Sequence, residues 1–376
     1  MPQLSVWEKE SFFAPQDVII VGSGFTGLWS ALHLQQLHPH YKITILERGI
    51  IPTGASTRNA GFSCFGSPTE LLHDEALMGE EKMLQLVEMR YKGLLEIKKY
   101  FTADEIDYDP CGGYECFTNK ENIWDTCISN IDWLNSKLKN ITNAENTFSV
   151  ADSKISDFGF SGIAHLIENK FEGALHSGKL VQALQKKVQQ AGVQILCGIE
   201  VISYQENSNS VEITTSAATF TAKQLLLCTN AFTNELIPAI DVIPNRGQVL
   251  LTSPIEDLKI KGTFHFDEGY YYFRNLGNRL LLGGARNKAF SEENTTAMQT
   301  TETIEKALND FIQTYLLPKT SYTITDKWSG IMAMGSDKLP LVQAITDKVF
   351  CCVRMSGMGV ALAPVASKEI AQIMNQ

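Results

Sequence analysis

The clearest pattern along the chain is an apolar run followed by glycines and then by apolar positions at helical spacing. Val18 to Val21 are all apolar and are bounded by turn residues, which predicts a buried strand. A helical pattern begins a few residues later and continues to about Gln35, and a β-rich run then covers Ile43 to Leu46. This order of strand, helix and strand predicts a βαβ unit in a parallel sheet.

Three glycines in the spacing GxGxxG occupy the turn between the first strand and the helix. Gly22 allows a tight turn, Gly24 lets the backbone approach a pyrophosphate, and Gly27 lets the helix pack closely on the strand. The helix N-terminus offers unpaired N–H groups and positive partial charge to phosphates. Glu47 ends the second strand, where it can accept hydrogen bonds from both ribose hydroxyls of an adenosine. The segment predicts dinucleotide binding, with a glycine-rich turn in some other βαβ unit as the alternative.

The remaining pattern mixes longer helices with short strands. Helices are predicted over Thr69–Phe101, about Lys120–Lys139, His176–Ala191 and Thr301–Tyr315, and short strands fill Val193–Cys228 and Phe266–Gly284. A last strand at Val349–Val353 is followed by a glycine turn and a final helix. With 376 residues, two domains are expected. We predict a nucleotide-binding domain from residues 1–85, 150–235 and 325–376, and a second domain from residues 86–149 and 236–324.

Composition narrows the classes of partner. The net charge of −10 argues against nucleic acid or an anionic membrane as the main partner. No apolar run is long enough to span a bilayer, and the N-terminal segment has acids where a signal peptide has basic residues, so we expect a cytoplasmic protein. The eight cysteines show no CxxC and no zinc-site spacing, so no metal site is predicted.

Later segments carry a resemblance to a known family. Gly54–Gly61 is a loop of mostly small residues shortly after Glu47, and Gly357 to Val360 open the final helix after a strand. Three more segments lie between these two, and all five occur in the order that the family has: Leu225–Ala231, Pro244–Gln248 and Trp328–Ile331. Together they resemble the amino-acid and amine oxidase flavoproteins built on the D-amino acid oxidase fold, and most of all the γ-glutamylputrescine oxidoreductase-like enzymes.

The resemblance implies a fold and a cofactor. The fold is α/β, with an FAD-binding Rossmann-like domain of the glutathione reductase type and an inserted α+β substrate domain. Relatives that attach FAD covalently do so at positions matching Asn59 and Gly330, so FAD is expected to be held non-covalently here. The residues implied to bind it are Gly22, Gly24, Phe25, Thr26, Gly27, Glu47, Arg48, Ala55, Ser56, Arg58, Asn59, Ala60, Gly61, Val201, Thr229, Asn230, Gly330, Gly357, Met358, Gly359 and Val360.

The resemblance also bears on the substrate. Amino-acid oxidases of this fold resemble one another in a Gly-x-Arg step that binds the substrate carboxylate, and Met332 stands at the matching position here. Arg274 and Arg286 are the alternative cations. Tyr270 and Tyr272 are expected on one face of a strand, where with Phe62 or Phe65 they can surround an amine by cation–π contact. Packing in the sheet explains these tyrosines equally well.

The implied activity is oxidation of the C–N bond of a small amine or amino-acid-like substrate by hydride transfer to flavin N5, after which the imine hydrolyses. No catalytic residue is identified, and the electron acceptor is O2 or another, unknown oxidant. Three alternatives remain: an amino-acid dehydrogenase that passes electrons to a quinone, a catalytically silent FAD-binding subunit, and an NAD-binding protein. The flavin-like C-terminal segment speaks against NAD.

Overall fold

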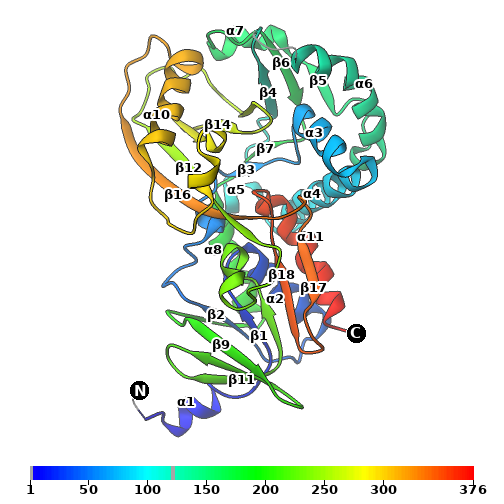
Figure 1. Cartoon of the computed structure of the whole chain (residues 1–376), viewed down its shortest axis with the longest axis vertical. Coiled ribbons are helices and arrows are strands. Elements are labelled where there is room, and N and C mark those ends of the chain that lie inside the picture. Colours follow the sequence, from blue (N-terminus) through cyan, green and yellow to red (C-terminus); the bar gives the residue numbers. More distant parts are fainter. Residues whose placement is uncertain (1–2, 120–122) are drawn as a thin grey trace. The chain divides into compact units, whose positions relative to one another are not determined.

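The computed structural model describes residues 3–119 and 123–376, and it divides the chain into two compact units (Figure 1). Unit 1 comprises residues 1–57, 178–244 and 332–376, and unit 2 comprises residues 58–177 and 245–331. The chain passes from unit 1 to unit 2 twice, after Thr57 and within β12 (Ile243–Thr252). It returns after Ser177 and within β16 (Ile324–Met334). The boundaries of the two domains predicted from the sequence stay a prediction.

Unit 1 is built on a largely parallel sheet. In the described part of the chain this sheet has eight strands, in the order β17-β18-β11-β1-β2-β8, with β10 paired to β11 and β9 to β10. Their bounds are β1 Gln16–Val21, β2 Ile43–Glu47, β8 Gln194–Cys197, β9 Val201–Glu206, β10 Val211–Thr215, β11 Thr219–Leu227, β17 Leu341–Ala344 and β18 Val349–Val353. The central runs are buried and apart from Thr44 apolar, as expected for parallel strands covered on both faces: Val18–Val21, Ile43–Leu46, Leu225–Leu227 and Val349–Val353.

Helices α2 and α11 pack on each other in unit 1, and both follow strands of its sheet (Figure 1). Ser367 Oγ in α11 donates to the Thr26 carbonyl in α2 at 2.9 Å, and His33 lies 3.2 Å from the Pro364 carbonyl. The helical segments of this unit are α1 Val6–Glu10, α2 Phe25–Leu37, η1 Ala55–Thr57, α8 Ser177–Gln190, η3 Asn230–Glu235 and α11 Gly359–Ile373. These polar contacts hold α2 against α11 at two points along its length.

Unit 2 contains a mixed sheet in the order β16-β12-β15-β14-β13-β4-β6-β5 and a short pair, β3 with β7. Strands not yet given bounds are β3 Phe62–Ser63, β4 Gly113–Phe117, β5 Phe148–Val150, β6 His165–Asn169, β7 Gly173–Ala174, β13 Thr263–Phe266, β14 Tyr271–Leu276 and β15 Arg279–Gly284. Its helical segments are α3 Pro68–Met78, α4 Glu80–Tyr100, α5 Ala103–Ile106, α6 Ile123–Thr142, η2 Asp152–Lys154, α7 Ile155–Phe158, η4 Arg286–Lys288, α9 Phe290–Glu293, α10 Glu302–Phe311 and η5 Ile312–Leu316.

Alternation along β12, β14 and β15 gives the unit 2 sheet two different faces. One face carries Leu250, Phe273 and Leu282 into an aromatic-rich core that includes α10 and η5. The other face carries Val249, Leu251 and Leu281, with Ala60, Phe62, Tyr272 and Trp328 packed beside them. We call this second set the Tyr272 face.

The structure corrects several expected elements. The helix predicted over Thr69–Phe101 is two helices, α3 and α4, because Gly79 between them has a φ of +86° and ends the first. Within Val193–Cys228, where short strands were expected, β11 is one strand of nine residues. Tyr270 precedes β14 instead of lying in it, since its N–H donates to the Asp267 carbonyl in a turn. The predicted helix start at Lys120 lies outside the described residues.

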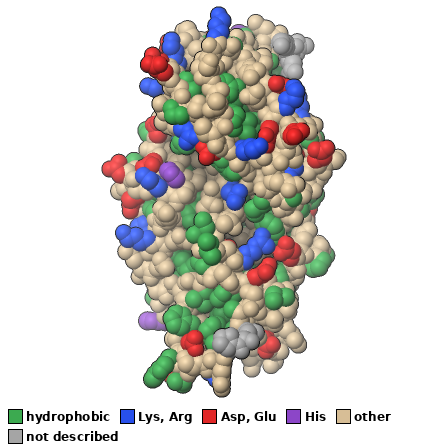
Figure 2. All heavy atoms as spheres, turned by 90° about the vertical axis from the view of Figure 1, so that its left-hand side faces the viewer, with side chains coloured by type: hydrophobic (Ala, Val, Ile, Leu, Met, Phe, Trp, Pro, Cys, Tyr) green, Lys and Arg blue, Asp and Glu red, His purple; other side chains and the backbone are tan. Residues whose placement is uncertain are grey.

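The surface carries charges of both signs. On the face drawn in Figure 2, basic and acidic side chains are interspersed with apolar ones. No described helix has the length and apolar character that crossing a membrane requires.

Candidate functional site

The glycine turn after β1 depends on two very close backbone contacts. Gly22 has a φ of +101°, and a Cβ there would lie 2.8 Å from the Cys228 carbonyl oxygen. A Cβ on Gly27 would lie 1.9 Å from the Gly22 carbonyl oxygen, so α2 starts directly against the turn. These geometries match the roles expected for the first and third glycines, a tight turn and a close helix–strand approach.

The middle glycine makes room for a side chain of the same unit. A Cβ on Gly24 would lie 2.9 Å from Ser56 Oγ, and that oxygen accepts a hydrogen bond from the Phe25 N–H at 2.9 Å. Ser56 lies in η1 together with Ala55, both named from the sequence. The small-residue loop therefore reaches the N-terminus of α2 and satisfies one of its unpaired N–H groups.

Glu47 is buried at the end of β2 and already accepts three hydrogen bonds. Its Oε2 accepts from the Ser23 N–H and from Ser23 Oγ, each at 2.9 Å, and its Oε1 accepts from the Gly49 N–H at 2.9 Å. An ionised carboxylate offers about four lone-pair sites. Three are used, so Glu47 retains capacity for one ribose hydroxyl instead of the two expected.

Arg48, Thr229 and Asn230 lie near the C-terminal ends of β2 and β11, and Val201 opens β9. The Arg48 guanidinium lies 4.0 Å from the centre of the Phe232 ring. Asn230 has a φ of +47°, and its Oδ1 is buried with no hydrogen-bond partner in the described part of the chain. Val201 packs against the core of the unit 1 sheet. Asn230 thus presents an unsatisfied acceptor at the sheet edge where Gly22 turns.

The turn between β18 and α11 contains strained residues. Arg354 and Ser356 have φ values of +65° and +45°, and Gly357 has +80°. The Arg354 guanidinium donates to Asp337 at 2.7 Å and to Asp241, and the Ser356 N–H donates to the Ala333 carbonyl at 3.1 Å. Ser356 Oγ is buried and has no partner among residues 3–119 and 123–376. Non-glycine residues in this region are unfavourable, and such strain clusters at functional sites.

Met332 and the first residues of α11 adjoin this turn. A Cβ on Gly357 would lie 3.3 Å from Met332 Sδ. Met358 precedes α11, and its carbonyl accepts from the Leu362 N–H at 2.9 Å, while Gly359 and Val360 form the first turn of the helix. The sequence-predicted residues Met332 and Gly357 to Val360 are therefore neighbours within unit 1.

In unit 2, the loop starting at Arg58 contacts β16. The Trp328 indole N–H donates to the Arg58 carbonyl at 3.0 Å, and the Arg58 guanidinium donates through Nη1 to the Ser329 carbonyl at 2.9 Å. A Cβ on Gly330 would lie 3.0 Å from the Arg58 Cβ, which explains the small residue at that position. The predicted residues Arg58 and Gly330 are thus in contact.

Asn59, Ala60 and Gly61 continue this loop. Asn59 Oδ1 accepts from the Gly61 N–H at 2.9 Å and from Ser177 Oγ at 2.5 Å, and Ala60 packs on the Tyr272 face. Gly61 has a φ of +73°, and a Cβ there would lie 2.3 Å from the Leu175 carbonyl oxygen. The loop conformation is fixed by the asparagine and by a position that excludes side chains.

Arg274 is used to hold the loop. It shares the Tyr272 face by alternation along β14, and its side chain donates to the carbonyls of Gly61 at 2.8 Å, Leu175 at 3.0 Å and Asn275 at 3.0 Å. Burial lowers the pKa of its guanidinium, although it is still a strong base. Its Nε and Nη1 donors are thus directed at backbone oxygens.

Tyr272 and Phe62 form an aromatic pair on the Tyr272 face. Their ring centres are 5.9 Å apart at 84°. The Tyr272 ring lies over Gly283, its cross-strand partner, where a Cβ would come within 2.4 Å of the ring. Burial raises the pKa of Tyr272 to about 12, so its phenol stays neutral at physiological pH.

Tyr270 and Arg286 do not join this pair. Tyr270 packs with the aromatic core on the other face of the sheet and lies 5.7 Å from the Phe290 ring. Arg286 lies 5.8 Å from the Tyr270 ring, and its guanidinium donates to Asn245 Oδ1 at 2.9 Å. The expected sharing of one face by Tyr270 and Tyr272 is therefore wrong, because the strand begins one residue too late for alternation to apply.

Two groups of residues near the Tyr272 face were missed from the sequence. Trp328 holds the Arg58 loop, although it was noted only as part of a motif. Cys64, Glu172 and His265 lie close together, with ligand atoms within 4.8 Å of one another, and all three are buried. Their wide separation in sequence gave no spacing signal.

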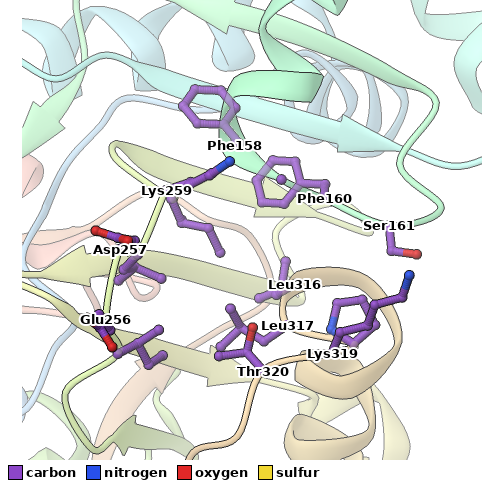
Figure 3. A pocket seen from close by; sticks show the side chains of 15 residues that line it. Phe158, Phe160, Ser161, Glu256, Asp257, Lys259, Leu316, Leu317, Lys319 and Thr320 are labelled. Atoms are coloured by element: carbon purple, nitrogen blue, oxygen red, sulfur yellow. The ribbon is translucent and has the colours of Figure 1, made fainter.

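A cavity of about 400 Å³ in unit 2 contains none of the predicted site residues (Figure 3). Phe158 and Phe160 line it on one side and Leu316 and Leu317 on another, and Lys259 and Lys319 also line it. It joins the aromatic core of the sheet, and the candidate site lies in other parts of the chain.

Comparison with known proteins identifies the relatives of this chain. It is 23% identical to "Probable oxidoreductase OrdL" of Rhizobium meliloti (strain 1021), over 95% of this chain and 82% of that protein. It is also 23% identical to gamma-glutamylputrescine oxidoreductase of Escherichia coli (strain K12), over 95% of this chain and 83% of the relative.

Solved structures confirm the expected fold. Glycine oxidase from Bacillus cereus ATCC 14579 superposes with a TM-score of 0.75 at 17% identity, covering 96% of this chain and 95% of that one. The profile of the family described as FAD dependent oxidoreductase, abbreviated DAO, matches residues 17–373. This chain is therefore a member of the DAO family of FAD-dependent oxidoreductases.

Proposed function

We propose that this protein oxidises the C–N bond of a small amine that lacks an α-carboxylate, with non-covalently bound FAD as the oxidant. Family membership supplies the cofactor and the class of reaction, and the sequence resemblance to this family is confirmed. This chain is similar in sequence to a gamma-glutamylputrescine oxidoreductase and in fold to a glycine oxidase. The choice between amine and amino acid rests on residues of this chain.

The residues of unit 1 suit an FAD molecule. Its adenosine and pyrophosphate would be held by the glycine turn, Glu47 and Ser56, because that turn leaves space for backbone contact and Glu47 has acceptor capacity remaining. The unsatisfied acceptor of Asn230 and the unsatisfied hydroxyl of Ser356 are further polar groups for this ligand. Neither Asn59 nor Gly330 can form a covalent flavin bond, since one is an amide and the other has no side chain.

FAD, when bound, would be the oxidant: its flavin N5 would accept a hydride equivalent from the carbon beside the amine. The imine product would then hydrolyse in water. The side chains of this protein have other tasks. The Phe62–Tyr272 pair offers an apolar, electron-rich surface that suits an amine. A Tyr272 phenol that stays protonated can donate a hydrogen bond but does not accept a proton from the substrate near neutral pH.

The engagement of Arg274 is the observation that carries the preference for amines. Its Nε and Nη1 atoms already donate to backbone carbonyls, and the Arg286 guanidinium donates to Asn245 Oδ1. By the sequence resemblance, Met332 stands where amino-acid oxidases carry a carboxylate-binding arginine. A carboxylate buried without a paired cation loses its hydration without a compensating interaction, which costs several kcal/mol.

Flavin reduction under anaerobic conditions tests this function. Matched pairs should be compared by stopped flow: an amine and its α-carboxylated analogue, with polyamines, γ-glutamyl amines, N-methyl amino acids and D-amino acids. We expect the amine member to bleach the flavin faster in each pair. Faster bleaching by the carboxylated member would overturn the amine preference, and no bleaching by any compound would favour a silent FAD-binding subunit.

Two controls complete the test. Acid precipitation should leave the flavin in the supernatant if it is held non-covalently. Reoxidation by O2, compared with reoxidation by a quinone, identifies the electron acceptor.

A further inference from the structure

Cys64, Glu172 and His265 form a buried cluster that the proposed oxidation does not use. Their side chains come from three separate parts of unit 2, and their possible ligand atoms lie within 4.8 Å of one another. Cys64 is 4% exposed, and the Glu172 and His265 side chains are 2% and 9% exposed. A thiol, a carboxylate and an imidazole are ligand types used by Zn²⁺.

Rigid elements position all three side chains. Cys64 follows β3, which pairs with β7 so that Ser63 faces Gly173, and Glu172 directly precedes β7. His265 lies in β13, between β4 and β14. The short β3–β7 pair thus brings Cys64 beside Glu172, and the large sheet supplies the histidine.

Glu172 is held in place by backbone groups. Its Oε1 accepts from the N–H of Phe65 at 3.0 Å and from that of Gly66 at 3.4 Å, which leaves Oε2 directed toward His265. Gly113 makes room for it, because a Cβ there would lie 2.1 Å from Oε2. Such hydrogen bonds to the far oxygen are typical of carboxylates that bind metals, since they orient the ligand.

The Glu172 carboxylate and the His265 imidazole lie within ion-pair distance of each other but beyond hydrogen-bond distance. His265 Nε2 lies 3.6 Å from Glu172 Oε2, beyond hydrogen-bond distance, and in the described part of the chain Nε2 has no hydrogen-bond partner. Zinc bound tetrahedrally to nitrogen and oxygen at about 2.0–2.2 Å sets those two atoms roughly 3.4 Å apart. The observed separation is close to that value.

We infer that Cys64, Glu172 and His265 bind one Zn²⁺ ion in unit 2. Three protein ligands leave a fourth position, which a water molecule would take. Glu115, the next buried carboxylate, is occupied by Ser67 and Thr69 and is not a ligand. The ion would join β3, β7 and β13. His265 is opposite Tyr272 in the strand pair, and its ring centre lies 5.3 Å from that of Phe62, so the ion would also fix the Phe62–Tyr272 pair.

Metal content of the FAD-loaded protein tests this site. After incubation with Zn²⁺ and a thiol reductant, followed by gel filtration, mass spectrometry of the metal should find one zinc per chain. Cys64→Ser and His265→Asn should each weaken zinc binding at least about 10-fold, with the flavin content unchanged. Cys127→Ser and His165→Asn are the matched controls, since they change another buried cysteine and another histidine of unit 2, and they should retain the zinc.

A measurement on the unaltered protein covers the case in which the variants fail to fold. X-ray absorption at the zinc edge should show one sulfur and two or three nitrogen or oxygen ligands. Co²⁺ in place of zinc should give tetrahedral d–d bands at wavelengths beyond the flavin absorption. Absence of stoichiometric zinc, a shell without sulfur, or full zinc retention in both Cys64→Ser and His265→Asn would each overturn the proposal. A histidine–carboxylate ion pair without metal would then be the alternative.

Discussion

Two strand–turn–helix segments of unit 1 have the same order of elements but differ in the backbone conformation of their turns. The first links β1 to α2, and its one positive φ falls on Gly22. The second links β18 to α11, and there Arg354 and Ser356 have positive φ as well as Gly357. A non-glycine residue in this region costs roughly 1–2 kcal/mol. The first turn is therefore relaxed, and the second must be held by its surroundings.

The contacts that hold the second turn come from distant positions. Asp241 and Asp337 accept from the Arg354 guanidinium, and the Ala333 carbonyl accepts from the Ser356 N–H. Local sequence determines the first turn, whereas long-range contacts determine the second. Stored strain of this kind is expected where backbone must meet a ligand, which agrees with the proposed flavin contact at Ser356.

The largest effect should come from Gly27→Ala in the relaxed turn. The new Cβ would lie 1.9 Å from the Gly22 carbonyl oxygen, and neither backbone segment can move without shifting α2 against β1. We expect a loss of about 3 kcal/mol or more in the free energy of unfolding, with loss of bound FAD. Urea unfolding followed by circular dichroism, together with the flavin-to-protein ratio, measures both.

Gly54→Ala is the control for this substitution. A Cβ at Gly54 meets nothing within 4 Å, so stability should change by less than about 0.5 kcal/mol. Equal losses in the two variants would show that the close contact at Gly27 is not what sets the turn.

Arg354→Ala should have the next largest effect. It removes both ion pairs but keeps a side chain at a φ of +65°. We expect about 2 kcal/mol of destabilisation, less than for a fully buried pair, because the Asp241 and Asp337 side chains are 42% and 28% exposed. Arg354→Gly loses the same ion pairs and relieves the strain, so it should be about 1 kcal/mol more stable than Arg354→Ala.

Thermal unfolding of the two Arg354 variants provides the measurement. If Arg354→Gly unfolds at the same temperature as Arg354→Ala or lower, the turn is not strained and the comparison between the two segments fails.

Acid should weaken the second turn more than the first. Hydrogen bonds from Ser336 and the charge of Arg354 lower the pKa of Asp241 below its ordinary value of 3.8. A lowered carboxyl pKa contributes stability above the ordinary value, and this contribution is lost as pH falls through the lowered value. Below about pH 4, the melting temperature should therefore fall more steeply in the wild type than in Asp241→Asn, which has no carboxylate to protonate. If the melting temperatures of the two proteins fall in parallel with pH, protonation of Asp241 does not weaken the second turn.

The sequence predicted the first turn and the general fold because those features depend on local residue type. Glycine spacing and an apolar strand specify β1, the turn and α2, and the structure has all three. The family resemblance extended this to the α/β fold. Glu47 was also correctly located at the end of β2, although its hydrogen bonds to Ser23 and Gly49 were not anticipated.

Side-chain partners across the fold were harder to predict. Nothing near Arg274 in the sequence indicates that its donors bind the carbonyls of Gly61 and Leu175, which are more than ninety residues away. Tyr270 was misplaced because the start of β14 depends on a turn set by Asp267. The cluster of Cys64, Glu172 and His265 has no sequence signal at all, since its members meet only through the pairing of β3 with β7 and the position of β13.

The smallest effect, and the most informative about function, is expected from Ser356→Gly. The substitution relieves a φ of +45° and removes a buried hydroxyl that has no partner in the described part of the chain. Both changes favour the folded protein, while the greater freedom of glycine in the unfolded chain opposes them, so the FAD-free protein should gain a few tenths of a kcal/mol. If the hydroxyl serves FAD, the same variant should bind FAD several-fold more weakly. A serine kept only for packing would leave FAD affinity unchanged. Two measurements therefore decide the role of this strain: the free energy of unfolding without FAD, and the FAD dissociation constant. A gain in the first with weaker FAD binding shows that the strain is retained for ligand binding.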